Sequence, residues 1–298
     1  MLDRFFIPNN HFLSRNTVSI IISIFCILNI AYIFPDIHTL FGDGSFIQAE
    51  INNRFVESHE PILEWYTNIF AAIGLSKDTS ILIIFTIYLS SLLLIVFNFK
   101  RSLFAFLAWF IHISIINSSH LFSYGADYFI SFALFINFLI NLTPLFKKET
   151  SQILYSFIIR FTQIQLCIVY FFAGFGKALG KDWLDGNAVW YVVNEFSPGA
   201  TKFMLNFVDY PILFKVMSWS VFIELLYPIL IFIPKTKKIT LIMIIGLHLS
   251  IGIFMKFYSF GAIMIILNIM AFGHYLKPEY DMIRGFIVKK KLLPQLLR

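Results

Sequence analysis

Four ionisable residues lie inside long apolar stretches of the sequence, where a charge is costly and indicates a functional or pairing role. They are His112, Arg160, Glu224 and His248. Each lies ten to twelve residues from a basic residue that borders its stretch, or roughly 15 to 18 Å along a helix. All four are therefore predicted near the middle of a hydrocarbon core about 30 Å thick.

Opposite charges at one depth predict an ion pair between Arg160 and Glu224 on consecutive spans. A charged pair in hydrocarbon needs further hydrogen bonds. The polar side chains that could supply them are His112, His248, Gln163, Asn137 and Asn141. Two alternatives stay open: the pair only locks two helices together, or the histidines only pack in the interior. No two of the ionisable residues have the spacing of metal ligands on one helix, so no metal site is predicted.

A line of polar and small residues follows Arg160 at intervals of three and four, which places its members on one helical face. The line comprises Arg160, Gln163, Cys167, Tyr170, Gly174 and Lys177. It is predicted to run from mid-membrane to the exported surface and to bound an outward-facing pocket. The alternative is a packing seam that ends in a lysine extending to the interface.

Transmembrane helices must position these residues. The chain has 298 residues, of which 58% are hydrophobic and 13% charged, whereas soluble domains carry about 25% charged residues. We predict an all-α integral membrane protein that forms a single domain over residues 1–298. Eight stretches approach the roughly 20 apolar residues of a spanning helix: 17–35, 79–99, 102–118, 126–145, 152–175, 213–234, 239–257 and 258–276.

Basic residues decide the orientation, because they concentrate in cytoplasmic segments. Both termini are predicted to be cytoplasmic, with a basic tail at 277–298 and extracytoplasmic segments at 36–78 and 176–212. The net charge of +6 does not indicate a nucleic-acid partner, because the cations border apolar runs instead of covering a separate polar face. Cys26 and Cys167 lie within apolar runs and predict no disulfide. The expected partner is the lipid bilayer.

From Arg160 to Tyr191 the sequence reads RFTQIQLCIVYFFAGFGKALGKDWLDGNAVWY. This segment resembles the signature of the HTTM superfamily, the membrane domain shared with vitamin K-dependent gamma-carboxylase. The matching residues are Arg160, Gln163, Tyr170, Ala173, Gly174, Lys177, Asp182, Trp183 and Gly186. Further similarity covers Asp36, Gly42-Asp43-Gly44, Gly125 to Asp127, Glu224, Pro228 and His248.

The resemblance implies that Lys177 is a catalytic base that acts on a reduced quinone. Such a lysine must be neutral, and partial burial beside the like charge of Lys181 would favour that form. Supporting or binding roles are predicted for Arg160, Gln163, Tyr170, Asp182, Trp183, Trp190, Glu224, His248 and His112. The chain differs from the carboxylase in having Gly176 in place of a second lysine and no counterpart of the large lumenal domain. Carboxylation of glutamate is therefore not expected.

In length and number of spans the chain is more similar to the SdpB (sporulation-delaying protein B) branch of the superfamily. Those bacterial membrane proteins act with an SdpA-like partner to mature a secreted antimicrobial peptide. The resemblance implies a multi-pass protein of the bacterial cytoplasmic (inner) membrane that matures or modifies a peptide substrate. The alternatives are a quinone-using gamma-carboxylase-like enzyme with lyase or oxygenase chemistry, a transporter of a small hydrophobic molecule or peptide, and a non-catalytic membrane scaffold.

Overall fold

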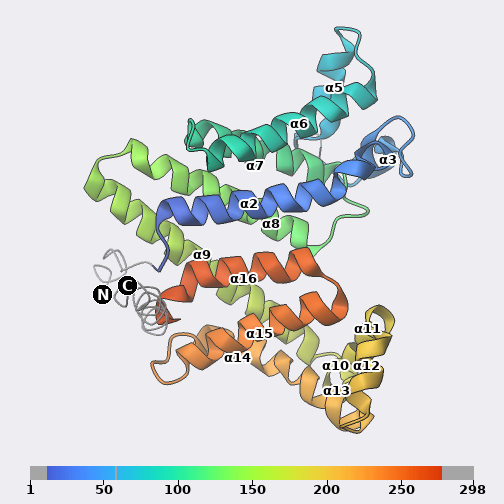
Figure 1. Cartoon of the computed structure of the whole chain (residues 1–298), viewed down its shortest axis with the longest axis vertical. Coiled ribbons are helices and arrows are strands. Elements are labelled where there is room, and N and C mark those ends of the chain that lie inside the picture. The colour runs from blue at the N-terminus through green and yellow to red at the C-terminus, as the bar shows by residue number, and fades with distance from the viewer. Residues whose placement is uncertain (1–11, 58, 277–298) are drawn as a thin grey trace, which may run out of the picture. The chain divides into compact units, whose positions relative to one another are not determined.

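The computed structural model describes residues 12–57 and 59–276, and their regular structure is helical, without strands (Figure 1). Seven segments of the described chain are long and apolar enough to cross a membrane: Arg15–Phe41, Lys77–Val96, Gly125–Leu145, Lys148–Ala178, Ile212–Leu230, Lys237–Met255 and Tyr258–Leu276. The third predicted span is helix α7 (Arg101–Asn117), which is apolar but has only 17 residues. The predicted all-α class is confirmed, and the apolar helices fit a multi-pass membrane protein.

Helix α9 (Lys148–Ala178) is shared by two compact units of the chain. We call residues 14–158 the N-terminal unit, and residues 159–276 with Phe12 and Leu13 the C-terminal unit. The sequence predicts one domain, whereas the contacts group into these two units, and each is described by itself.

The N-terminal unit consists of long helices and of short helical elements that connect some of them (Figure 1). The long helices are α2 (Arg15–Ile33), α6 (Lys77–Val96), α7 and α8 (Gly125–Leu142). The short elements are η1 (Phe34–Asp36), α3 (Ile37–Phe41), α4 (Ala49–Asn53), α5 (Leu63–Ala71) and η2 (Thr143–Leu145). The serine hydroxyls of Ser14 and Ser76 accept hydrogen bonds from backbone amides of the first turns of α2 and α6, which fixes where these helices begin.

Buried amide side chains hold α8 against α2. Asn141 Nδ2 donates to Ser19 Oγ at 2.8 Å, and Asn137 Nδ2 donates to Ser23 Oγ at 3.2 Å. Hydrogen bonds of this kind join helices in apolar surroundings, where hydrophobic burial does not. The prediction that these two asparagines support a mid-membrane ion pair is therefore wrong, because they bond to serines of α2 instead.

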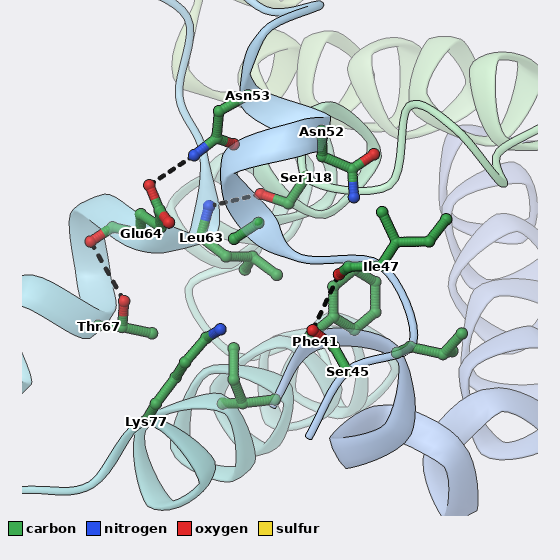
Figure 2. Close-up of a pocket in the computed structure, with 13 residues that line it drawn as sticks. Phe41, Ser45, Ile47, Asn52, Asn53, Leu63, Glu64, Thr67, Lys77 and Ser118 are labelled. Atoms are coloured by element: carbon green, nitrogen blue, oxygen red, sulfur yellow. Dashed lines mark hydrogen bonds between the residues drawn. The ribbon is translucent and has the colours of Figure 1, made fainter. Parts of the chain in front are cut away.

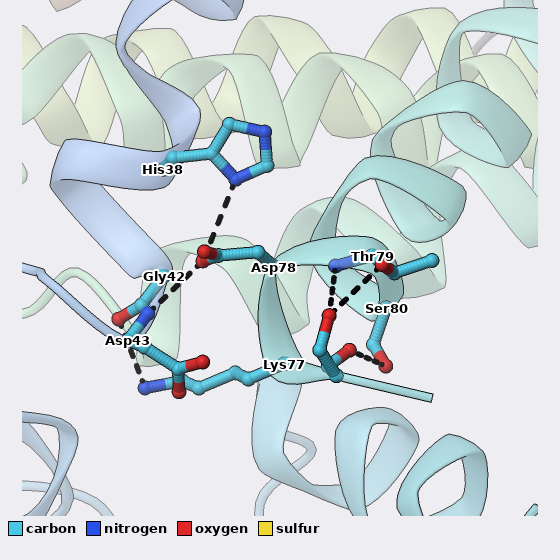
Figure 3. Close-up of polar contacts among 8 residues, drawn as sticks. His38, Gly42, Asp43, Lys77, Asp78, Thr79 and Ser80 are labelled. Atoms are coloured by element: carbon cyan, nitrogen blue, oxygen red, sulfur yellow. Dashed lines mark hydrogen bonds and ion pairs between the residues drawn. The ribbon is translucent and has the colours of Figure 1, made fainter. Parts of the chain in front are cut away.

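The turn after α3 is fastened to the start of α6 (Figure 3). Asp78 Oδ1 accepts a hydrogen bond from the backbone amide of Asp43 at 3.0 Å and lies 3.6 Å from His38 Nδ1. Lys77 Nζ donates to the carbonyl oxygen of Gly42 at 3.2 Å. Gly42 and Asp43 thus join the turn after α3 to the first turn of α6.

In the C-terminal unit, long helices carry a group of short ones at one end (Figure 1). The bounds are α10 (Lys181–Asp185), α11 (Asn187–Phe196), α12 (Pro198–Leu205), α13 (Tyr210–Ser218), α14 (Ser220–Leu230), α15 (Lys237–Met255), α16 (Tyr258–Phe272) and η3 (Gly273–Leu276). Val189, Val193 and Phe214 form a buried cluster that joins α11 to α13. The sixth predicted span, 213–234, is divided at Trp219 between α13 and α14.

Close approach of α9 and α14 depends on Gly174. A Cβ atom at this position would lie 2.8 Å from Leu225 Cα, closer than packed atoms allow. We expect Gly174→Ala to lower the free energy of unfolding by about 1–3 kcal/mol, because the two helices must separate. Gly176→Ala is the matched control, since its Cβ would meet nothing within 4 Å. Thermal unfolding of the purified variants measures both, and equal melting temperatures would contradict the packing role.

Candidate functional site

Lys177 and Glu224 form an ion pair in the C-terminal unit. Lys177 Nζ lies 2.8 Å from Glu224 Oε1 and 2.6 Å from Oε2, so one ammonium group contacts both carboxylate oxygens. The Glu224 side chain is 4% exposed and the Lys177 side chain 27%. The last turn of α9 positions the lysine, and Gly174, one turn earlier, lets α14 bring Glu224 within reach. The carboxylate is thus almost wholly removed from solvent, whereas the ammonium group reaches the surface of the unit.

Trp183 lies over the other side of the lysine. Lys177 Nζ is 5.1 Å from the centre of the Trp183 ring, within the range of a cation–π contact. The chain returns toward Lys177 because α9 ends at Ala178 and the short helix α10 follows. Gly186 ends α10 with φ 87°, and a Cβ there would lie 2.6 Å from the carbonyl carbon of Phe214. The glycine at position 186 is therefore required by this turn.

A cavity of about 710 Å³ lies beside the ion pair and is lined by Lys177 and Trp183. The remaining lining is mostly apolar and comes from α11 and from α13 to α15, including Trp219, Met243 and Gly246. Trp219 is 56% exposed, so the cavity opens at the surface of the C-terminal unit. Ligand sites of about 300–1,000 Å³ with few polar groups are typical of small-molecule binding. The cavity fits an apolar molecule that presents one polar end to Lys177.

Two other pockets provide a comparison. A pocket in the N-terminal unit, lined by Asn52, Glu64 and Lys77, has a volume of about 20 Å³, which is room for about one water molecule (Figure 2). A groove of about 330 Å³ in the C-terminal unit is lined by Cys167 and Pro228 and is otherwise made of aliphatic and phenyl side chains. Neither has both the size and the charged group of the cavity at Lys177.

A chain of hydrogen bonds crosses the core of the C-terminal unit through four helices. Tyr227 OH donates to Asn268 Oδ1 at 2.8 Å, and Asn268 Nδ2 donates to Tyr170 OH at 2.6 Å. Tyr170 OH lies 2.8 Å from His248 Nε2. Tyr170 accepts from Asn268, and the direction of its bond to His248 depends on the tautomer of the imidazole: where Tyr170 donates to Nε2, the proton of His248 is on Nδ1. That atom is buried and has no hydrogen-bond partner among the described residues.

Arg160 and Glu224 do not form the predicted ion pair. Arg160 Nη1 donates to Gln163 Oε1 at 2.8 Å, and the carboxylate of Glu224 is held by Lys177. Seventeen residues, or roughly 25 Å of helix, separate Arg160 from Lys177. The prediction that Arg160 and Glu224 share one depth is therefore wrong.

The length of α9 explains this error. The helix has 31 residues, about 45 Å, whereas its predicted span was 152–175 and a hydrocarbon core is about 30 Å thick. Gly174 lies against Leu225, while Ile164 and Phe232 line one groove, so α9 and α14 run in opposite directions. Counting residues from the nearest cation predicts the depth of a residue in the membrane only if the bordering cations of neighbouring helices lie at the same depth. The cations that border α9 and α14 do not.

The other predicted site residues are divided among several places. Gln163 Nε2 donates to the carbonyl oxygen of Ala271, so Gln163 ties α9 to α16. Trp190 packs against the cluster of Val189 and Phe214. Asp182 is exposed on α10. His112 belongs to α7 of the N-terminal unit, where its ring centre lies 5.9 Å from that of Tyr88. Of the predicted set, Lys177 and Trp183 line the cavity, Glu224 pairs with Lys177, and Tyr170 bonds to His248.

Asn268 and Tyr227 were not among the predicted site residues, although they complete the hydrogen-bond chain. The signal for Asn268 was present, because an amide side chain within an apolar span suggests a hydrogen-bonded role. The apolar lining of the cavity carries no comparable signal, because the same side chains are ordinary in any membrane helix.

Within the described residues, no three His, Cys, Asp or Glu side chains lie close enough together to hold a metal ion. No family model, curated protein or solved structure matches the chain. The function must therefore be argued from the cavity, the ion pair and the sequence signature.

Proposed function

We propose that the C-terminal unit binds an amphipathic molecule in the cavity beside the Lys177–Glu224 pair. The observation that carries this proposal is one lysine at the wall of a mostly apolar cavity of about 710 Å³. An ammonium group there attracts a carbonyl, phenolate or carboxylate oxygen, while the apolar wall holds the rest of the molecule. Trp183 and Trp219 provide flat aromatic surfaces for it.

The pair also supplies acid–base chemistry. The ammonium group of Lys177 donates hydrogen bonds to Glu224. In the proposed step, Lys177 passes a proton to Glu224 and takes one from the ligand. Glu224 is then the net proton acceptor, and Lys177 stays charged and holds the ligand oxygen. This assignment differs from a lysine that acts as the base by itself. A reduced quinone fits the cavity, because it has an apolar body and oxygen atoms at its ring, and when bound it would supply reducing electrons.

The biological role that we propose is the maturation or modification of a secreted antimicrobial peptide by an HTTM-type, SdpB-like protein of the bacterial cytoplasmic membrane. An SdpA-like partner and the peptide substrate belong to this proposal, as does a cytoplasmic location for both termini. It is supported by the signature from Arg160 to Gly186, of which Gly174, Lys177, Trp183 and Gly186 build the site.

Mass spectrometry of the secreted peptide pool tests the role. Cells that produce the protein should secrete a peptide whose mass differs from that in cells without it. Lys177→Ala should abolish the difference, and Lys181→Ala, which removes an exposed lysine four residues away, should retain it. An unchanged pool in cells without the protein would overturn the maturation role, and an unaffected pool in Lys177→Ala would overturn the site.

A further inference from the structure

Besides α6, which begins with Lys77 and has Asp78 in its first turn, three helices that start in the N-terminal unit begin with a cation. Arg15, Arg101 and Lys148 are the first residues of α2, α7 and α9. The N-terminus of a helix carries a partial positive charge, so acidic residues are favoured there and basic residues are not. Neither α2 nor α7 has an acidic residue in its first turn, and α9 has only Glu149. The arrangement is unfavourable for each helix by itself.

Hydrogen bonds join these helix ends. Arg101 Nη1 donates to Asn16 Oδ1 at 2.7 Å, which connects the start of α7 to the start of α2. Arg15 Nη1 donates to Thr143 Oγ1 at 3.1 Å, at the end of α8, and also to Ser151 Oγ in the first turn of α9. The unfavourable N-terminal charges therefore lie at one end of the unit.

Among the described residues, the acceptors that hold the two arginines are all neutral. They are two hydroxyl groups, one side-chain amide and the carbonyl oxygen of Ile95, which accepts from Arg101 Nε at 2.9 Å. The face of the Tyr155 ring, 5.9 Å from the Arg15 guanidinium, is also uncharged. No carboxylate of the described chain pairs with either arginine. Within the described chain, both guanidinium groups are thus oriented by uncharged partners alone.

Neighbouring residues add charge and apolar surface. Lys100 and Lys147 directly precede α7 and α9, and Lys148 and Glu149 are the first two residues of α9. Phe99, Leu145 and Phe146, which precede these lysines, are 51%, 70% and 52% exposed. A bound anion at this end would therefore have apolar side chains next to it.

We propose that Arg15 and Arg101 form a binding site for the phosphate group of an anionic phospholipid. Guanidinium groups bind phosphate oxygens in a fixed, planar geometry, and the three helix N-termini add to the attraction. The exposed apolar residues favour a lipid over free phosphate, because acyl chains cover them. The charge distribution predicts that this end faces the cytoplasm, where anionic lipids attract basic segments.

Lipid retention by the purified full-length protein tests the site. The protein is reconstituted in an equal mixture of phosphatidylglycerol and phosphatidylcholine, and native mass spectrometry measures which lipid stays bound. We expect wild-type protein to retain phosphatidylglycerol preferentially, and the double variant Arg15→Gln/Arg101→Gln to lose the preference about tenfold. Lys235→Gln/Lys237→Gln, which removes two positive charges from the C-terminal unit, should leave the preference unchanged.

Melting temperatures separate binding from a purely structural role. Phosphatidylglycerol should raise the melting temperature of wild-type protein relative to phosphatidylcholine, and the double variant should show no such rise. If the melting temperature of the double variant fell equally in both lipids and the variant still retained phosphatidylglycerol preferentially, the site would be overturned. Stabilisation of wild-type protein by inorganic phosphate as large as that by phosphatidylglycerol would show a free-anion site and overturn the lipid assignment.

Discussion

Lys177→Met should lower the free energy of unfolding by about 3–5 kcal/mol, because it leaves the Glu224 carboxylate buried without its partner. Glu224→Leu should cost less, since the Lys177 side chain is 27% exposed and can turn toward water. The double variant Lys177→Met/Glu224→Leu should recover most of the stability, because replacing both charges with apolar groups removes the unpaired charge. Chemical unfolding of the purified variants gives the three values, and Lys181→Met serves as the control for loss of a lysine.

The same cycle distinguishes a functional pair from a helix lock. We expect the double variant to be folded but inactive in peptide maturation, because the ligand contact and the acid–base group are both gone. A double variant that is stable and fully active would show that the pair only holds α9 to α14, as a non-catalytic scaffold requires. If the losses of unfolding free energy in the two single variants simply added in the double variant, the two side chains would not be coupled.

Filling the cavity should abolish function without unfolding the protein. Gly246 lines the cavity, and a Cβ at this position would meet nothing within 4 Å. We expect Gly246→Leu to lower the affinity for the ligand at least about tenfold. The added side chain takes the space of an apolar part of the ligand, and burial of that part contributes more than about 1.4 kcal/mol to binding. The free energy of unfolding should rise by up to about 1 kcal/mol, because glycine is a poor residue within a helix.

Quenching of tryptophan fluorescence by a short-chain quinone measures access to the cavity, since Trp183 and Trp219 both line it. Gly199→Leu is the matched control, because Gly199 is likewise unobstructed but lies in α12 and not in the cavity lining. Normal peptide maturation by Gly246→Leu would show that the cavity is not the site. Loss of maturation with unchanged quinone quenching would show that the ligand is of another class.

Rules that apply within a single helix were sufficient to predict the helices and the residues that share one face of α9. Apolar runs predict spanning helices because each helix must satisfy its own backbone in lipid, and this requirement does not depend on neighbouring helices. Spacing of three and four residues predicts that Gln163, Tyr170, Gly174 and Lys177 share a face. The structure confirms this, because all four contact helices α14 to α16.

Pairing between helices was decided only by the tertiary structure. The partner of Glu224 depends on how α14 is placed along α9, which in turn depends on the close contact at Gly174 and on the length of α9 beyond its apolar core. Asn137 and Asn141 found serines of α2 because α8 packs there. The cavity arises where the sixth span is divided at Trp219, and no single residue encodes that space. Hydropathy and periodicity are properties of one helix, whereas partners and cavities are properties of several.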